Sequence, residues 1–165
     1  MKRVVITGLG AMTPIGNNVS EYLEGLRSGK SGAAPITQFD AAQFKTRFAC
    51  EVKGFNPEEH LDRREARKLD RFSQFALVTA GEAMEDAQID VEQINLDRAG
   101  VIWGSGIGGL GSLEKEIEEN TNAETPRYNP YMVPKMIADI AAGQISIKYG
   151  FRGVNYATVS ACASS

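Results

Sequence analysis

The sequence predicts an α/β fold with a largely parallel sheet, because short β-branched runs alternate with longer amphipathic segments along all 165 residues. Three short runs are typical of buried strands, since they are apolar and each is bounded by glycine or polar residues. They are residues 4–8, 99–104 and 154–160. The segments between them have the three- to four-residue apolar spacing of helices.

The elements follow one another in a clear order. Val4 to Gly8 is expected to form the first strand, which glycine ends. Asn18 or Ser20 is expected to cap a helix that continues to about Arg27. A further short strand can form near residues 48–52.

The strongest helical pattern covers residues 65–87, where apolar and alanine residues recur on one face. A strand at 99–104 then leads into a glycine-dense turn at 104–111. Helices are expected at 112–120 and 134–149, before the last strand at 154–160. We interpret the whole chain, residues 1–165, as part of one domain.

Composition excludes several classes of function. The net charge of −3 disfavours general nucleic-acid binding, and no apolar run approaches the roughly 20 residues of a membrane span. The N-terminus has no signal-peptide pattern. Cys50 and Cys162 lie far apart and are expected to be free thiols in a reducing compartment. We therefore expect a soluble, cytoplasmic protein.

The segment 156–165, Tyr-Ala-Thr-Val-Ser-Ala-Cys-Ala-Ser-Ser, carries the chemical signal. A strand delivers Cys162 into a run of small residues, which leaves room for a substrate at the sulfur. If a helix begins at Cys162, its dipole and free N–H groups favour the nucleophilic thiolate. The alternative is a buried structural thiol, and this segment alone does not decide between the two.

Five motifs in order resemble the elongating β-ketoacyl-acyl-carrier-protein synthases of the thiolase superfamily. Besides the segment around Cys162, the resemblance rests on four other stretches. They are residues 4–10 with 13–16, the turn at 104–109, the Pro-Tyr-Met-Val-Pro at 130–134, and 149–153. Within this family, the chain most resembles the bacterial chain-elongating synthases of the synthase II type.

The resemblance implies a thiolase-like fold, five-layered (α-β-α-β-α) in the intact protein, of which this chain would be most of the N-terminal half. It implies no metal and no redox cofactor. Cys162 would be the acylated nucleophile, and its N–H one oxyanion donor. The family's two catalytic histidines would lie beyond residue 165. The one histidine here, His60, matches no catalytic position, so we expect residues 1–165 alone to be inactive.

The resemblance also assigns binding roles. Ile107 would form a wall of the acyl pocket, and Met132 would line it across a homodimer interface; ordinary core packing is the alternative for Ile107. Four basic residues would dock an acidic acyl carrier protein, although a solvated helix face is the more usual reason for a basic cluster such as the first three. They are Arg64, Arg67, Lys68 and Arg127. Tyr128 stands where relatives are often basic, which weakens that half of the patch.

Other functions remain open at the level of sequence. Gly104, Gly106 and Gly109 have the spacing of a dinucleotide loop, but a lone match of this kind is weak. A ketosynthase of a polyketide pathway is an alternative within the same class. A non-catalytic binding or dimerisation remnant is an alternative of another class, against which the presence of Cys162 argues.

Overall fold

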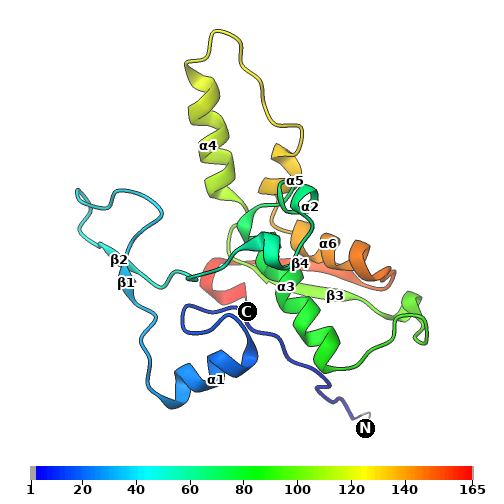
Figure 1. Ribbon diagram of the computed structural model, residues 1–165. Helices are drawn as coiled ribbons and strands as arrows, with labels where there is room; N and C mark the ends of the chain where they lie inside the picture. The colour runs from blue at the N-terminus through cyan, green and yellow to red at the C-terminus, as the bar shows by residue number, and fades with distance from the viewer. Residues whose placement is uncertain (1–2, 165) are drawn as a thin grey trace. The chain divides into compact units, whose positions relative to one another are not determined.

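The structure is a computed structural model that describes residues 3–164, and it divides into two compact units. Unit 1 comprises Met1–Asn56 and Thr79–Gln88, and unit 2 comprises Pro57–Val78 and Ile89–Ser165. The α-helices are α1 (Val19–Arg27), α2 (Arg63–Ala66), α3 (Arg71–Asp86), α4 (Leu110–Thr121), α5 (Met132–Met136) and α6 (Ile140–Tyr149) (Figure 1). The strands are β1 (Ala34–Pro35), β2 (Phe48–Ala49), β3 (Val101–Ser105) and β4 (Asn155–Val159).

Unit 1 confirms the first predicted helix and part of a predicted strand. The side chain of Asn18 accepts a hydrogen bond from Glu21 N at 2.8 Å and so caps α1. The strand expected near residues 48–52 is reduced to β2, which pairs antiparallel with β1.

The prediction of a strand at residues 4–8 is wrong for the described structure. No described residue pairs with this run, and Val4 and Ile6 are 92% and 82% exposed. A strand needs a neighbour for its N–H and C=O groups. The backbone that follows this run is bound by carboxylates of α3. Asp86 accepts a hydrogen bond from Leu9 N, and Glu82 accepts one from Ala11 N.

Unit 2 is built on a parallel pair of strands. β3 and β4 run in register from Val101 opposite Asn155 to Ser105 opposite Val159. α6 packs against both strands (Figure 1) and buries Ala141, Ala142 and Ile145. The parallel arrangement of β3 and β4 agrees with the predicted parallel sheet and brings both carboxyl ends to one edge.

Two long predicted helices are each interrupted. The pattern at 65–87 forms α2 and α3, because Asp70 starts a new helix by accepting from Phe72 N at 3.0 Å. The pattern at 134–149 forms α5 and α6, because Ile137 adopts an extended conformation with ψ 135°. Apolar spacing continues across both breaks, so periodicity alone did not reveal them.

Candidate active site and basic cleft

Cys162 and the glycine-rich turn lie at the same edge of the unit 2 sheet. β3 ends at Ser105 and leads into the turn at 104–111, while β4 ends at Val159, three residues before Cys162. The carboxyl edge of a parallel sheet is the usual place for a reactive site in α/β proteins. The topology therefore brings the predicted nucleophile and the predicted acyl-pocket turn together, although more than 50 residues separate them in sequence.

A tight turn presents Cys162 at the end of β4. Ala161 has a φ of 49°, a left-handed conformation that non-glycine residues rarely adopt, and it reverses the chain just before the cysteine. Residues Ala161–Ser164 form a 3-10 helix. The α-helix expected to begin at Cys162 is thus not formed in the described residues, and its dipole does not act on the sulfur there.

Ser164 holds this turn against β3. Its hydroxyl oxygen accepts from Ser160 N at 2.7 Å and lies 2.9 Å from Ser105 O and 2.8 Å from Ala161 O, so its proton can go to either carbonyl. The carbonyl of Ser164 accepts from Thr158 Oγ1 at 2.7 Å. Ser164, one of the small residues noted in the sequence, therefore acts as a structural clamp on this turn. The sequence pattern alone gave no reason to single it out. Ser165 lies outside the described residues.

Both cysteines are exposed and unpaired. Exposure rules out a buried structural thiol at Cys162 in the described structure and leaves the sulfur open to a reagent or substrate. Cys50 is exposed as well, so exposure alone does not distinguish the two thiols. The difference between the two thiols is their setting, because Cys162 alone lies at the carboxyl edge of β3 and β4.

The glycine-rich turn packs tightly on the C-terminal end of α5. A Cβ at Gly109 would lie 2.0 Å from Lys135 O, and one at Gly108, whose φ is +94°, would lie 2.4 Å from Met136 O. Gly109 N donates to Met136 O at 3.0 Å. That N–H is therefore committed to the protein, which disfavours the dinucleotide interpretation of the turn.

The predicted acyl-pocket residues flank this contact. Ile107 is exposed in the turn, and Met132 is half-buried at the first position of α5. Ile107 is thus not an ordinary core residue in the described structure. His60 is exposed in a separate segment of unit 2. Within residues 3–164, no group of three or more His, Cys, Asp or Glu side chains is placed to hold a metal ion.

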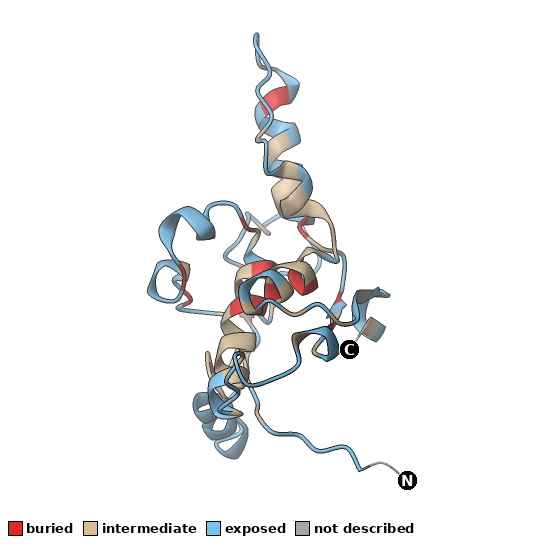
Figure 2. Ribbon diagram, turned by 90° about the vertical axis from the view of Figure 1, so that its right-hand side faces the viewer, coloured by how far each residue is buried: buried red, intermediate tan, exposed pale blue. Residues whose placement is uncertain are grey.

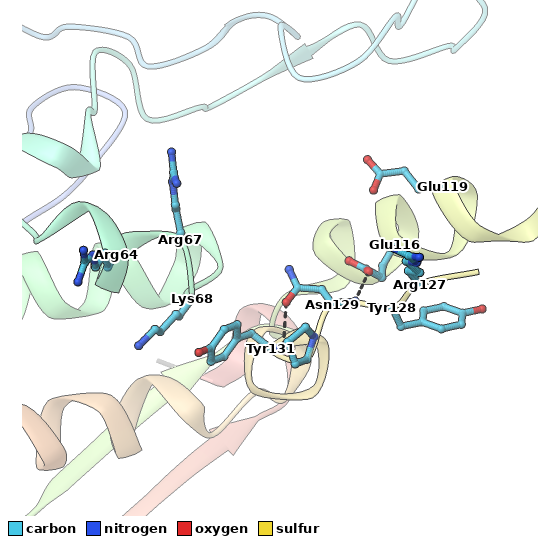
Figure 3. Close-up of a pocket in the computed structure, with 10 residues that line it drawn as sticks. Arg64, Arg67, Lys68, Glu116, Glu119, Arg127, Tyr128, Asn129 and Tyr131 are labelled. Atoms are coloured by element: carbon cyan, nitrogen blue, oxygen red, sulfur yellow. Dashed lines mark hydrogen bonds between the residues drawn. The ribbon is translucent and has the colours of Figure 1, made fainter. Parts of the chain in front are cut away.

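All four predicted docking residues line one open cavity of about 740 Å³ in unit 2. Three come from α2 and the residues after it, and the fourth comes from the loop between α4 and α5 (Figure 3). The remaining lining residues are Glu116, Glu119, Tyr128, Asn129, Pro130 and Tyr131. We call this cavity, with the ten residues that line it, the basic cleft.

Aromatic side chains belong to the basic cleft as well. Lys68 Nζ lies 5.5 Å from the centroid of the Tyr131 ring, within the range of a cation–π contact. Tyr128 is exposed on the same wall as Arg127. At this position, where relatives often have a basic residue, the chain therefore has an aromatic ring in place of a charge. Tyr131 was not assigned to this surface from the sequence, and Tyr128 was considered there only as a missing charge, because docking was sought in charge alone.

Three comparisons agree with this geometry. The family described as "Beta-ketoacyl synthase, N-terminal domain" matches residues 1–165. The 3-oxoacyl-(acyl-carrier-protein) synthase 2 of Synechocystis sp. is 45% identical over 163 residues, which cover 99% of this chain and 39% of that relative. The chain therefore spans about two fifths of the length of this curated relative.

Solved ketosynthase structures share the fold. The ishigamide ketosynthase/chain length factor is 29% identical, with a TM-score of 0.80 over 95% of this chain and 39% of its own. A chain in the solved complex of a type II polyketide acyl-carrier protein with its ketosynthase is 24% identical to this one. The TM-score is 0.75, over 96% of this chain and 41% of that chain. The chain thus has the N-terminal part of the thiolase-like ketosynthase fold, and it belongs to the β-ketoacyl synthase family.

Proposed function

We propose that the intact protein is a β-ketoacyl-acyl-carrier-protein synthase that elongates fatty-acyl chains, with Cys162 as its nucleophile. The observation that carries the proposal is the exposed Cys162 on a clamped turn at the carboxyl edge of β3 and β4. The identity of 45% to a 3-oxoacyl-(acyl-carrier-protein) synthase 2 over almost the whole chain supports the fatty-acid pathway.

The reaction begins with acyl transfer. The thiolate of Cys162 attacks the carbonyl carbon of an acyl-carrier thioester, and the carrier's thiol leaves as a new thioester forms on Sγ. The backbone N–H of Cys162 is one candidate donor to the oxyanion of the tetrahedral intermediate. Malonyl-carrier protein then loses CO₂, and its carbanion attacks the acyl-cysteine carbonyl. The cysteine thiolate leaves, and the product is a β-ketoacyl chain longer by two carbons.

The groups that assist decarboxylation are proposed to come from beyond this chain. The one histidine of the sequence is His60, which is exposed and lies in a polar stretch, so the chain does not supply two imidazoles to one site. We also propose that Ile107 and Met132 contact the acyl chain. The packing of the glycine turn on α5 supports this, because it joins the segments that carry them.

The basic cleft is the proposed docking site for the acyl carrier protein. Carrier proteins are strongly acidic, and a concave surface lined by four cations attracts such a partner and orients it. The solved complex of a polyketide carrier protein with its ketosynthase supports a carrier as partner for this fold. We extend the proposal to a cytoplasmic homodimer; the two exposed, unpaired cysteines are typical of a reducing compartment.

A condensation assay on the intact protein tests the function. Acyl- and malonyl-carrier protein should yield a β-ketoacyl product, and Cys162→Ala should reduce its formation by at least about a thousandfold, as loss of a nucleophile does. Cys50→Ala is the matched control and should retain activity. A folded Cys162→Ala variant that elongates acyl chains at the wild-type rate would refute the assignment. A preference for polyketide starters over fatty-acyl chains would favour the polyketide pathway instead.

A further inference from the structure

Asn120 is buried in a part of the molecule that is otherwise exposed. It is 7% exposed near the end of α4, whereas every residue from 121 to 128 is exposed (Figure 2). Both ends of its side-chain amide are bonded. Nδ2 donates to Glu116 O at 2.8 Å, and Oδ1 accepts from Arg127 N at 2.6 Å. A buried amide with both ends satisfied fixes the backbone that it binds.

Glu116, one helical turn earlier, binds the same loop. Its Oε1 accepts from Asn129 N at 2.5 Å (Figure 3). Side chains four residues apart on a helix lie about 6 Å apart along its axis. Alternate N–H groups of an extended chain are about 6.6 Å apart on one side. The side chains of Glu116 and Asn120, which we call the α4 bracket, therefore match the spacing of the N–H groups of residues 127 and 129.

The bracket fixes a wall of the basic cleft. It holds Arg127 and Asn129 by their backbone, and Asn129 Oδ1 in turn accepts from Tyr131 N at 2.9 Å. The Tyr131 ring then meets Lys68 from the opposite side of the cleft. Arg127 and Lys68, two of the four basic residues of the cleft, are thus connected to α4 through contacts that begin at the bracket.

The charge of Glu116 opposes the proposed partner. A carboxylate among four cations lowers the positive potential of the cleft and so weakens attraction to an acidic protein. A role in attracting a carrier protein therefore does not account for Glu116. Its bond to the backbone N–H of Asn129 does, because a charged acceptor forms a stronger hydrogen bond than a neutral one.

We propose that Glu116 and Asn120 are positioning residues for carrier docking, which hold Arg127 where it faces the same partner as the basic residues after α2. This inference rests on the proposed function of the cleft and adds the residues that shape it. A different contact holds the segments that carry the proposed acyl-pocket residues. Gly109 N donates to Met136 O and so holds α5 to the glycine turn. Loss of the bracket should therefore affect docking and leave the chemistry at Cys162 intact.

Steady-state kinetics of the intact protein test whether the bracket affects carrier docking. Glu116→Ala and Asn120→Ala should each raise KM for acyl-carrier substrate roughly fivefold, the size of one hydrogen bond of ordinary strength. The kcat with a small acyl thioester should not change. Glu116→Gln keeps an acceptor oxygen but loses the charge, so its KM for the acyl-carrier substrate should stay below that of Glu116→Ala. Glu118→Ala, on an exposed residue of the same helix, removes the same charge as Glu116→Ala and is the control.

The two explanations of Glu116 predict opposite signs. If its charge alone mattered, Glu116→Ala would lower KM for the carrier, and so would Glu116→Gln. That result would overturn the proposal. A fall in kcat with both substrates would also overturn it, since it would assign the bracket to general folding.

Hydrogen exchange separates this inference from the proposed function. The amide of residue 129 should exchange slowly in wild type and Glu116→Gln, and fast in Glu116→Ala. The amide of residue 127 should exchange fast in Asn120→Ala. Unchanged exchange in both variants would overturn the bracket itself. If exchange follows the prediction but Arg127→Glu leaves KM for the carrier unaltered, carrier docking at this cleft is refuted while the bracket stands.

Discussion

Single residues decide how much chemistry this chain can supply. The strand and the small residues around Cys162 marked it as a candidate nucleophile, the family resemblance favoured that role over a structural thiol, and the exposed side chain agrees with it. The turn that presents it could not be foreseen, since Ala161 adopts a left-handed conformation without glycine or asparagine to signal it. The role of Ser164 depends on a contact with Ser105, 59 positions earlier, which no local pattern encodes.

The basic cleft shows the same limit. Arg64, Arg67 and Lys68 form a visible cluster in the sequence, but Arg127 joins them only in the folded chain. Its place there was predicted from the family resemblance and not from spacing. Tyr131 was missed, and Tyr128 was noted only for its lack of charge, because a search for charge does not detect aromatic walls.

Reversal of two of these charges tests the cleft. Arg67→Glu with Lys68→Glu should raise KM for carrier-bound substrate about tenfold and weaken its dependence on salt, because exposed charges act mainly on encounter. Turnover of a small acyl thioester should stay near wild type. Arg98→Glu with Lys148→Glu changes the net charge equally on exposed residues outside the cleft. An equal loss with both substrates would make the patch a folding element.

Elements could be predicted where a local signal marks them. The strands β3 and β4 and the cap of α1 were predicted closely, since β-branched runs and an N-cap residue are local features. The breaks at residues 67–70 and 137–139 were missed. Asp70 was not recognised as the start of a helix, because the apolar spacing on either side of it stays in phase.

The prediction of a strand at residues 4–8 failed for a different reason. A β-branched run shows that a segment suits a strand, but it does not show that a partner is available. In unit 1 of the described structure the run has no partner strand. Its apolar residues Val4 and Ile6 remain exposed.

An ion pair joins the segment before β3 to the segment before β4. Arg152 Nε donates to Asp97 Oδ1 at 2.6 Å, and this hydrogen bond, with the charge of Arg152, holds the pKa of Asp97 below its ordinary value of 3.8. A lowered carboxyl pKa stabilises the fold at pH values above 3.8, and the effect is lost as the pH falls through the lowered value. Because both groups are exposed, the contribution is small and screened by salt.

Thermal unfolding of the intact protein should reveal this pair. Asp97→Asn should lower Tm slightly near neutral pH and at low salt. The difference from wild type should shrink as the pH falls below 3.8 and through the lowered pKa of Asp97, beneath which the carboxyl is protonated in both the folded and the unfolded state. Added salt should shrink it as well. A difference of the same size at every pH would mean that the pair contributes through packing and not through charge.

The whole molecule leaves apolar surface uncovered. Ile102 and Tyr156 lie opposite each other in the β3–β4 register, on the face that alternates with Val101, and they are 64% and 48% exposed. Parallel sheets are normally covered on both faces. Exposed apolar surface of this kind marks an interface or an aggregation site.

Residues 1–165 expressed alone should therefore be poorly soluble and should unfold without a cooperative transition. They should also form no β-ketoacyl product, because the chain has one histidine and spans 39% of the relative from Synechocystis sp.. Co-expression with the remaining part of the gene should restore both properties. A soluble, cooperatively folding chain that condenses substrates unaided would show that the missing length is dispensable.

The proposed function depends most directly on Cys162 as the residue that carries the acyl chain. The intact protein would be incubated with acyl-carrier protein in the absence of malonyl-carrier protein, digested, and its two cysteine peptides compared by mass spectrometry. We expect a thioester-linked acyl mass on the peptide of Cys162, which disappears when malonyl-carrier protein is added. An acyl mass on Cys50, with Cys162 unmodified, would contradict the assignment of the nucleophile.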